Sequence, residues 1–405
     1  MKEQQMILVL DFGGHNKELV AREVRAMGVY SEIRPGSLTV DKIKALNPIG
    51  IILTGNTDKC DPGVHQLGVP VTSSHDNLQS FVMEDCKARG DYDVDGYLEQ
   101  KVAEIRQAVG EQRVLLALSG GVDSSVCAAL LVKAIPGQIN CIFVDHGFMR
   151  HGEPHAIAKA FEGQDINFVS IDAESRFLAK LAGVTDPEEK RKIIGHEFIT
   201  VFEEESKKLG DILFFAQGTI YPDIVESGGD YGNLVKSHHN VGGLPEKLGF
   251  EKVIEPLAGL FKDEVRKLGA KLGLPNEIVN RQPFPGPGLA VRCIGELTKA
   301  KMDTLRAADH IVTQEIEANV NPAPQQYFCV LTNTPSVGIK NHTRIYDPVI
   351  AVRAINTQDF MTATYYPIPH EILAKIANRI TAEVDGVSRV VYDITSKPPG
   401  TVEWE

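Results

Sequence analysis

The sequence lacks the features that mark a metal-binding, secreted or membrane-spanning protein. Its six cysteines form no Cys-x-x-Cys pair and show no other metal-ligand spacing, which favours reduced thiols. Cys127 and Cys141 are expected in the core. No apolar run approaches the roughly 18 residues that a membrane helix needs, and the first residues do not resemble a signal peptide. We therefore expect a cytoplasmic protein without a membrane partner.

An excess of basic residues is also absent. The 42 Lys and Arg residues stand against 54 Asp and Glu residues, which gives a formal net charge of -12. This balance argues against nucleic acid as a partner, so an anionic substrate must be held by local groups. The 405 residues, 43% hydrophobic and 24% charged, predict a soluble globular chain of two or three domains.

The stretch 115–130 carries the clearest chemical signal. An apolar run over 114–118 predicts a buried strand, a Gly–Ser loop follows, and a small-residue helix begins at once. Such a loop turns N–H groups toward the positive end of the helix, and we expect positive φ at Gly121. The Gly-Lys-Ser/Thr of a Walker loop is missing. The loop instead resembles the SGGxDS loop of the ATP-pyrophosphatases, with an ordinary helix-capping turn as the structural alternative.

Polar groups also end the other strands predicted between 113 and about 275. Asp145 begins the run Asp-His-Gly after one strand, Asp172 ends the next, and Gln217 begins Gln-Gly-Thr after a third. Ligands bind beyond the carboxyl ends of the strands in open parallel sheets. The sequence therefore predicts that these groups converge on one crevice.

Two further polar segments allow a structural and a functional interpretation. The run 186–192 is interpreted as the solvated N-terminus of a helix. The run 236–243 contains the adjacent residues His238 and His239, but the other ligands of a metal site are missing. We interpret this second run as a loop that covers the substrate.

Residues 6–53 alternate between predicted strands and helices, and they resemble the start of a class I glutamine amidotransferase. The likeness rests on Asp-Phe-Gly-Gly at 11–14 and Ile-Ile-Leu-Thr-Gly at 51–55. A glutaminase needs a nucleophilic Cys on a G-x-C-x-G elbow, which neither Cys60 nor Cys86 provides, and no His-Pro-Glu follows. Residues 58–76 contain turn residues with little periodicity. We expect a truncated domain without glutaminase chemistry.

The fold expected overall is α/β with a parallel-sheet core. The predicted parts are an amidotransferase-like α/β remnant (1–76), a helical linker (77–112), an ATP-pyrophosphatase domain of the adenine nucleotide α-hydrolase-like type (113–285) and a C-terminal α+β dimerisation domain (286–405). The last boundary is the proline-stiffened run 280–289. Two prolines and the single Trp suggest that the C-terminal tail is docked.

Together these segments resemble the GMP synthetase family from the linker to the last residue. The motifs are LSGGVDSS, IFVDHG, FAQGTIYPD, KSHHNVGGLPE, LFKDEVRKLG, NRQPFPGPGLAVR, DFMTA and YDITSKPPGTVEWE. The family joins ammonia to XMP through an adenylated intermediate formed with ATP. The resemblance therefore implies ATP and Mg²⁺ as cofactors and a homodimer formed by the C-terminal domain. The run 338–342 departs from the family's usual turn, which puts the local contacts there in doubt.

The resemblance also implies roles for individual residues. The pyrophosphate of ATP would be held by Ser119, Gly120, Gly121, Val122, Asp123, Ser124 and Ser125. The base and ribose of ATP would be bordered by Val144, Gln217 and Gly218. The metal would be bound by Asp123 and Asp223. The lid over the reacting nucleotide would carry Lys236, His238 and His239, which with Asp123 are the expected catalytic residues. XMP would be bound by Arg292, Gln326, Lys397 and Glu403.

Several alternatives stay open at this point. The chain could be an ammonia-dependent synthetase, a weak synthetase-like subunit that needs a separate glutaminase, or a nucleotide-sensing pseudo-synthetase. Another ATP-pyrophosphatase, acting on a deazapurine or nicotinate nucleotide, is a further rival, against which the C-terminal tail counts. The intact loop 119–125 counts against a decayed enzyme. The missing glutaminase elbow predicts that XMP and free ammonia are the substrates.

Overall fold

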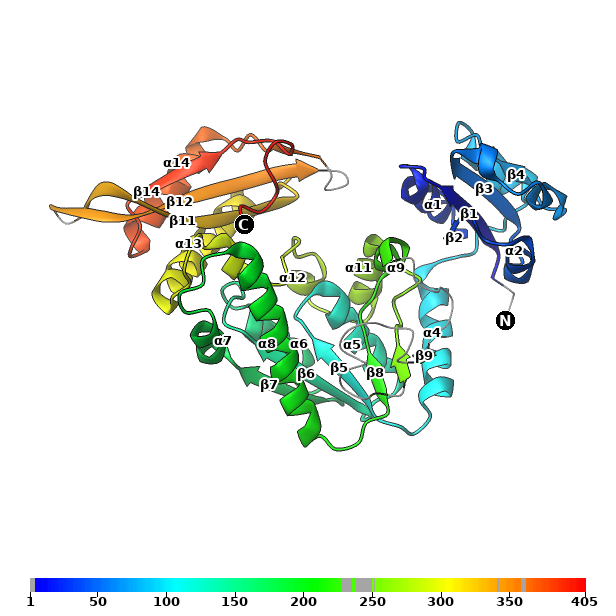
Figure 1. Ribbon diagram of the computed structural model, residues 1–405, viewed down its shortest axis with the longest axis horizontal. Helices are drawn as coiled ribbons and strands as arrows, with labels where there is room; N and C mark the ends of the chain where they lie inside the picture. Colours follow the sequence, from blue (N-terminus) through cyan, green and yellow to red (C-terminus); the bar gives the residue numbers. More distant parts are fainter. Residues whose placement is uncertain (1–3, 228–234, 238–249, 251, 341, 358–361) are drawn as a thin grey trace. The chain divides into compact units, whose positions relative to one another are not determined.

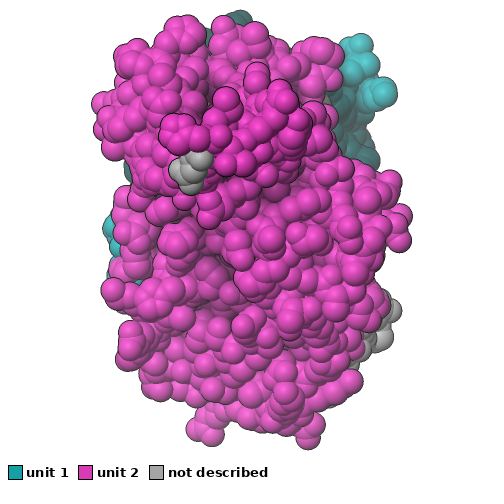
Figure 2. Space-filling view, turned by 90° about the vertical axis from the view of Figure 1, so that its left-hand side faces the viewer, with its two compact units in different colours: residues 1–110, 218–235, 255–272 teal, residues 111–217, 236–254, 273–405 magenta. Residues whose placement is uncertain are grey.

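A computed structural model describes residues 4–227, 235–237, 250, 252–340, 342–357 and 362–405. The chain divides into two compact units, which are coloured separately in Figure 2. Unit 1 comprises residues 1–110, 218–235 and 255–272, and unit 2 comprises residues 111–217, 236–254 and 273–405. The domain boundaries expected from the sequence follow a different division and stay a prediction.

Unit 1 is built on a parallel sheet that is buried on both faces. Its strands are β1 (Met6–Phe12), β2 (Tyr30–Pro35), β3 (Gly50–Gly55) and β4 (Val71–Thr72), in the order β2-β1-β3-β4. Successive side chains of a strand point to opposite faces, so Ile7 and Val9 enter one core while Leu8 and Leu10 enter the other. Strand β4 lies within the segment that the sequence predicted to be irregular.

The helices of unit 1 come from three separate parts of the chain. They are α1 (Lys17–Ala26), α2 (Val40–Leu46), α3 (Leu78–Ser80), α4 (Val94–Val109), α9 (Tyr221–Ser227) and α11 (Lys262–Lys271), with short turns η1 (Thr57–Lys59) and η2 (Pro62–Gln66) and the π-helical η3 (Phe81–Asp85). The stretch expected to be a helical linker is therefore interrupted between η3 and α4.

A buried ion pair joins the first of these parts to the last. The guanidinium of Arg25 on α1 donates to Glu264 on α11 at 2.6 Å and lies 4.3 Å above the ring centroid of Tyr30. Glu264 also accepts from the backbone N–H of Phe261 at 2.8 Å, which caps α11. The remnant-like N-terminal residues thus share one core with segments that lie far along the sequence.

Unit 2 contains the parallel sheet that the sequence predicted. Its strands are β5 (Val114–Leu118), β6 (Ile139–Asp145), β7 (Asn167–Asp172), β8 (Phe214–Ala216), β9 (Val235–Ser237) and β10 (Lys252–Ile254), in the order β7-β6-β5-β8-β10-β9. The pairings from β7 through β10 are parallel. The helices among these strands are α5 (Val122–Ala134), α6 (Glu153–Phe161), α7 (Glu174–Lys180) and α8 (Pro187–Lys208) (Figure 1). The α/β parallel-sheet prediction is confirmed.

The C-terminal part of unit 2 forms a second sheet with two long helices. After α12 (Asn276–Val279) and η5 (Gly288–Arg292), the elements are α13 (Lys299–Asn319), β11 (Gln326–Lys340), β12 (Thr343–Thr357), β13 (Ala363–Tyr365), α14 (His370–Glu383) and β14 (Arg389–Asp393). Strand β12 pairs with β11 and β13 antiparallel and with β14 parallel. The run 338–342 lies at the tip of the β11–β12 hairpin, and Asn341 is outside the described residues.

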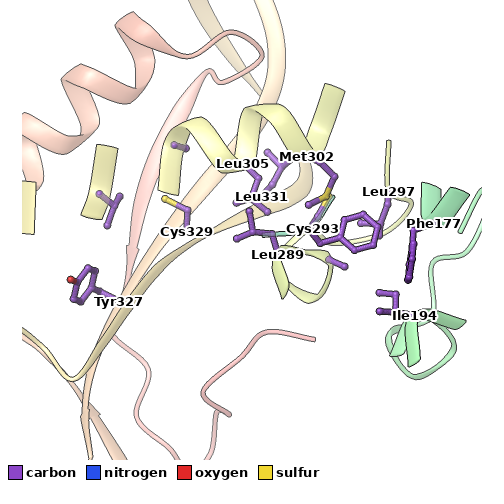
Figure 3. Close-up of a cluster of buried hydrophobic side chains, with 14 of the residues drawn as sticks. Phe177, Ile194, Leu289, Cys293, Leu297, Met302, Leu305, Tyr327, Cys329 and Leu331 are labelled. Atoms are coloured by element: carbon purple, nitrogen blue, oxygen red, sulfur yellow. The ribbon is translucent and has the colours of Figure 1, made fainter. Parts of the chain in front are cut away.

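A single hydrophobic cluster runs from the parallel sheet into this C-terminal part. Figure 3 shows Phe177 and Ile194, from α7 and α8, beside Leu297 and Met302 at the start of α13. The same cluster extends to Leu331 on β11. Burial of this shared apolar surface stabilises the two sheets of unit 2 as one body.

The predictions about cysteines and membrane segments can be compared with the described residues. All six cysteines are free thiols, and Cys127 and Cys141 are buried as expected. Within the described part of the chain, no helix combines the length and apolar character that crossing a membrane requires.

Candidate active site

The loop between β5 and α5 adopts a tight turn at the end of a buried strand. Gly120 has φ +76°, and Gly121, with φ -66°, is the N-cap of α5. The hydroxyl of Ser119 accepts the N–H of Gly121 at 3.2 Å and lies 3.1 Å from the hydroxyl of Ser124. The expectation of positive φ at Gly121 was therefore wrong, because Gly120 makes the left-handed turn.

Two observations describe the surroundings of this loop. A Cβ on Gly120 would lie 2.5 Å from the end of the Ile157 side chain and 2.8 Å from the end of the Met149 side chain, so both ends would have to shift to admit it. The hydroxyl of Ser125 is buried and has no hydrogen-bond partner among the described residues. Because the first N–H groups of α5 also lack helical partners, the loop fits a phosphate group.

Arg281, which was not predicted as a site residue, forms a hydrogen bond with this loop. The guanidinium of Arg281 donates to the backbone oxygen of Gly120 and lies 3.7 Å from the carboxylate of Glu153. Arg281 stands in the Asn-Arg-Gln run that was interpreted only as a boundary. The sequence offered one indication of a role for Arg281, namely its place within the proline-rich run 280–289. Only the fold brings Arg281 to the loop between β5 and α5.

The carboxyl ends of β6 and β7 meet as predicted, but Gln217 is not among the residues that line the cavity at this edge. Asp145 and Asp172 are paired residues of the two strands and line one cavity of about 250 Å³. Burial raises the pKa of Asp145, and the nearby Asp172 adds to this shift, although the N–H of Gly147 donates to Asp145 at 2.9 Å. This edge therefore concentrates negative charge in a partly desolvated place.

Cations from α13 reach the same cavity. Lys299 lies 3.0 Å from the carboxylate of Glu174, and Arg306 lies 3.7 Å from it. Arg306 also donates to the backbone oxygens of Met149, at 3.1 Å, and Gly147. These residues were not predicted, because their helix belongs to the C-terminal part of the chain. They hold the loop after β6 in place.

The residues expected around the base and ribose of ATP lie near the carboxyl ends of β6 and β8. Val144 is buried within β6. Gln217 follows β8, where its N–H donates to Ile254 at 3.0 Å and its backbone oxygen accepts from the Cys127 thiol at 3.7 Å. Gly218 belongs to unit 1, so it is described apart from these residues.

The two expected metal ligands belong to different units. Asp123 lies in the first turn of α5 in unit 2. Asp223 lies in α9 of unit 1 and accepts the N–H of Ile220 at 2.9 Å. The described residues contain no cluster of three or more His, Cys, Asp or Glu side chains that could hold a metal.

The expected lid falls largely outside the described part of the chain. His238 and His239 are not among the described residues. Lys236 lies in β9, and its side chain is likewise not described. Their predicted role stays a prediction.

Three of the four residues expected to bind XMP come together. The guanidinium of Arg292 is fully buried and donates to both carboxylate oxygens of Glu403, from Nε at 2.9 Å and from Nη2 at 2.8 Å. The amide of Gln326 donates to the same carboxylate at 3.4 Å. Arg292 also lies 3.9 Å above the ring centroid of Phe328. Its Nη1, which carries two N–H groups, is buried and has no hydrogen-bond partner among the described residues.

The fourth residue lies on the same docked tail as Glu403. The backbone of Lys397 exchanges two hydrogen bonds with Ala363, at 2.8 and 3.0 Å. The indole N–H of Trp404 donates to Asp393 on β14 at 2.9 Å. The tail is therefore docked on the second sheet, as its composition suggested.

Comparison with known families finds two matches. Residues 313–404 match the family described as GMP synthase C terminal domain. Residues 94–192 match the family described as NAD synthase, and this range contains the loop 119–125 and the ends of β6 and β7.

Full-length relatives give a broader match. The chain is 42% identical to a GMP synthase (glutamine-hydrolyzing) of Ruminiclostridium cellulolyticum and 43% identical to one of Acetivibrio thermocellus, with 99% of both chains covered in each case. A relative from Bacteroides thetaiotaomicron is 47% identical, with 100% of both chains covered.

Solved structures give weaker likenesses. One is an NMN synthetase from Francisella tularensis, with a TM-score of 0.37 and 18% identity, which covers 49% of this chain and 79% of that one. Another is an NAD synthetase from Campylobacter jejuni, with a TM-score of 0.36 and 16% identity, which covers 57% of this chain and 89% of that one. Both TM-scores are too low to define the fold of the whole chain.

Proposed function

This chain belongs to the GMP synthase family, and we propose that it aminates XMP to GMP with ATP, taking ammonia directly as the nitrogen donor. ATP would activate XMP as an adenylated intermediate, with release of pyrophosphate, and ammonia would then displace AMP. The observation that carries this proposal is the pairing of two built features in unit 2. One is the loop 119–125 at the N-terminus of α5, with the buried hydroxyl of Ser125, and the other is the buried cluster of Arg292, Gln326 and Glu403.

The first half-reaction needs the leaving pyrophosphate to be stabilised. The base oxygen of XMP attacks the α-phosphorus of ATP, and the bond to the bridging oxygen of the β-phosphate breaks. Residues 119–125 would hold the departing pyrophosphate with backbone N–H groups, hydroxyls and the N-terminus of α5. Asp123 would hold Mg²⁺, which neutralises phosphate charge when bound.

XMP would be recognised by the cluster on the second sheet. Arg292, Gln326 and Glu403 are far apart in the sequence, yet all three side chains meet, and the buried Nη1 of Arg292 has no hydrogen-bond partner within the described structure. An acceptor atom of XMP would satisfy this donor. Lys397, on the tail that carries Glu403, would add a positive charge for an anionic ligand.

The second half-reaction requires that water be kept away. We assign Lys236, His238 and His239 to the lid that would cover the adenylated intermediate, since hydrolysis would waste it. The lone pair of ammonia attacks the carbon that carries the adenylate, and the carbon–oxygen bond to AMP breaks. Loss of a proton from the added nitrogen completes GMP.

Ammonia as the direct donor is supported by the state of the thiols. A glutaminase nucleophile needs a lowered thiol pKa. Burial, together with Asp85, instead raises the pKa of Cys86 to about 12, and burial, together with Asp61, raises the pKa of Cys60. At pH 8 a pKa of about 12 leaves roughly 10⁻⁴ of Cys86 as thiolate.

The remaining thiols do not replace these two. Burial raises the pKa of Cys293 to about 11, and it also raises the pKa of Cys141 and Cys329. Cys127 is buried in α5, where its thiol donates to a backbone oxygen. None of these positions offers an activated, accessible thiolate.

The lengths of the alignments also support a missing glutaminase segment. The alignment with the Ruminiclostridium cellulolyticum relative extends over 508 positions, whereas this chain has 405 residues. That relative, described as glutamine-hydrolyzing, therefore contains about 100 positions that this chain lacks. The relative from Bacteroides thetaiotaomicron, which is described as a putative glutamine-hydrolyzing GMP synthase, aligns over only 435 positions and contains no additional segment of this size.

We further propose that the C-terminal part forms a homodimer. The β11–β12 hairpin exposes large apolar side chains, with Ile339 exposed by 80% and Tyr346 by 62%. Exposed apolar patches of this kind mark protein–protein contacts. We also propose the predicted domain boundaries at residues 76, 112 and 285 and a cytoplasmic location for the protein.

A donor assay tests the proposed function. Purified protein with ATP, Mg²⁺ and XMP should produce GMP, AMP and pyrophosphate with ammonium chloride and produce no GMP with glutamine. The rate with ammonium should rise with pH toward the ammonium pKa, because only free ammonia has a lone pair to attack. As a control, Cys60→Ser and Cys86→Ser should leave the ammonium-dependent rate unchanged.

Two outcomes would contradict the proposal in different ways. Absence of XMP-dependent pyrophosphate release would refute the synthetase function itself. GMP formation from glutamine by this chain alone, abolished by Cys60→Ser or Cys86→Ser, would refute only the direct use of ammonia. Glutamine-dependent synthesis that requires an added glutaminase would indicate a two-subunit enzyme.

A further inference from the structure

A fully buried lysine stands where the sequence predicted a solvated helix end. Helix α8 begins as expected, because the side chain of Asp186 caps the N–H of Glu189 at 2.8 Å. Lys190, one residue further along, has a side-chain exposure of 0%. Its neighbour Lys192 is exposed. The prediction of a solvated run was therefore wrong for Lys190, and a buried ammonium demands a specific partner.

The partners of Lys190 lie on both sides of the proposed XMP cluster. Its ammonium donates to the backbone oxygen of Cys293 at 2.8 Å and to the carboxylate of Glu405. Cys293 directly follows Arg292, and Glu405 stands two residues after Glu403. One buried cation is therefore bonded next to each member of the Arg292–Glu403 pair.

Further contacts fix Glu405 in this place. The other oxygen of its carboxylate accepts the N–H of Gly295 at 3.2 Å. The guanidinium of Arg191 donates to the backbone oxygen of Glu405. The side chain of Glu405 is only 6% exposed, so its charge depends on these partners rather than on water.

A second buried cation holds the tail before Glu403. The guanidinium of Arg353, on β12, has 1% exposure and donates to the backbone oxygens of Thr401, at 2.7 Å, and Val402, at 2.9 Å. It pairs with the carboxylate of Asp393 at 2.7 Å. Glu403 is thus held between a segment bonded to Arg353 and a residue bonded to Lys190.

We propose that Lys190 and Arg353 are positioning residues for XMP, which fix the carboxylate of Glu403 against Arg292 without contacting the substrate. This inference rests on the proposed function, in which the Arg292 cluster binds XMP. Arg292 is the last residue of η5, and Glu403 lies on the tail. Lys190 is bonded to Cys293, which directly follows Arg292, and to Glu405 near the end of the tail, so it would keep the separation of the two segments constant. A well-placed Glu403 would in turn fix the guanidinium of Arg292, whose Nη1 would donate to the ligand.

The role in positioning and a role in stability alone make different predictions. A residue that only stabilises unit 2 should affect ATP and XMP alike, because the phosphate loop lies in the same unit. A positioning residue should raise the KM for XMP selectively. Lys190 and Glu405 act through one bond, so their effects should not add.

The experiment measures the KM for XMP and for ATP by pyrophosphate release with ammonium as donor. The variants are Lys190→Met, Glu405→Gln and their combination, with Lys192→Met as the matched control on the same helix. We expect each single variant to raise the KM for XMP by about tenfold and the KM for ATP by less than about twofold. The combined variant should resemble the worse single variant, and Lys192→Met should resemble the wild type.

Glu405→Gln keeps the side-chain shape, and the combined variant leaves no buried charge unpaired, so it tests the inference even if one of the single variants does not fold. Equal increases in both KM values, or no increase for XMP, would overturn the positioning role. Additive effects in the combined variant would overturn the shared bond. A wild-type chain without XMP-dependent pyrophosphate release would refute the proposed function, and this inference with it, whereas an active wild type with unaltered variants refutes the inference alone.

Discussion

Replacing Glu403 by glutamine should destabilise unit 2 strongly. The guanidinium of Arg292 is 0% exposed, and Glu403 is the carboxylate paired with it through two hydrogen bonds. The guanidinium of Arg292 also contacts the rings of Phe328 and Phe284, which carry no formal negative charge. Loss of one partner from a buried pair costs about 3–5 kcal/mol. Because Glu403 is 17% exposed, we expect the lower end of this range, about 3 kcal/mol.

Thermal unfolding measures this cost. A unit of this size changes its Tm by roughly 2–4 °C per kcal/mol, so Glu403→Gln should lower Tm by about 6–12 °C. Asp385→Asn, which removes an exposed partner of Lys340, should leave Tm unchanged. Adding Arg292→Met to Glu403→Gln should recover part of the loss, because no buried charge then remains unpaired. A Tm for Glu403→Gln within about 2 °C of the wild type would refute the reasoning.

Four further predictions concern the phosphate loop, the tail and one buried histidine. Gly120→Ala should reduce stability and pyrophosphate release, because a Cβ is strained at φ +76° and would displace the ends of the Ile157 and Met149 side chains, whereas Gly121→Ala should keep the fold; equal Tm values for the two variants would contradict this. Asp123→Asn should abolish XMP-dependent pyrophosphate release with an unaltered circular dichroism spectrum, and near-normal release would remove Asp123 from the reaction. Lys397→Ala should raise the KM for XMP far more than that for ATP, and equal changes would favour a purely structural tail. Burial lowers the pKa of His146 to about 4, so the unfolded chain binds a proton that the folded chain excludes between pH 6.5 and about 4. The free energy of unfolding should therefore fall by about 2 kcal/mol from pH 6.5 to pH 5 through His146, and His146→Gln should remove this fall in urea titrations.

The buried position of His146 also shows which tautomer the fold selects. The N–H of Phe148 donates to Nδ1 of His146 at 3.0 Å, so this nitrogen acts as an acceptor. A neutral imidazole with its proton on Nε2 agrees with the lowered pKa of His146. Protonation at low pH would set two donors against each other, which is the local reason for the predicted acid sensitivity.

Features with a local cause were predictable from the sequence. The apolar run 114–118, the Gly–Ser loop and the small-residue helix predicted the order strand, loop and helix, and β5 and α5 follow it. Strand and helix periodicities are properties of neighbouring residues, so they are visible in one segment. The identity of the glycine in the left-handed turn is not determined locally. Gly120 is distinguished by its neighbours Ile157, on α6, and Met149, in the segment before α6.

The residues of the XMP cluster were identified by their likeness to a family, and the fold brought three of them together. Nothing in the spacing of Arg292, Gln326 and Glu403 predicts a bidentate ion pair with an amide beside it. Likewise, the division of the chain into units depends on contacts such as Arg25 with Glu264, which are 239 positions apart.

Lys190 marks the limit of interpretation from sequence. A run of charged residues after a helix cap predicts a solvated surface, because an isolated ammonium loses too much hydration energy when it is buried. The carboxylate that compensates this loss belongs to Glu405, which is 215 positions away. The sequence alone determined the helix and its cap, whereas only the tertiary structure decided that Lys190 is inside, since a buried charge is stable only where the fold supplies its partner.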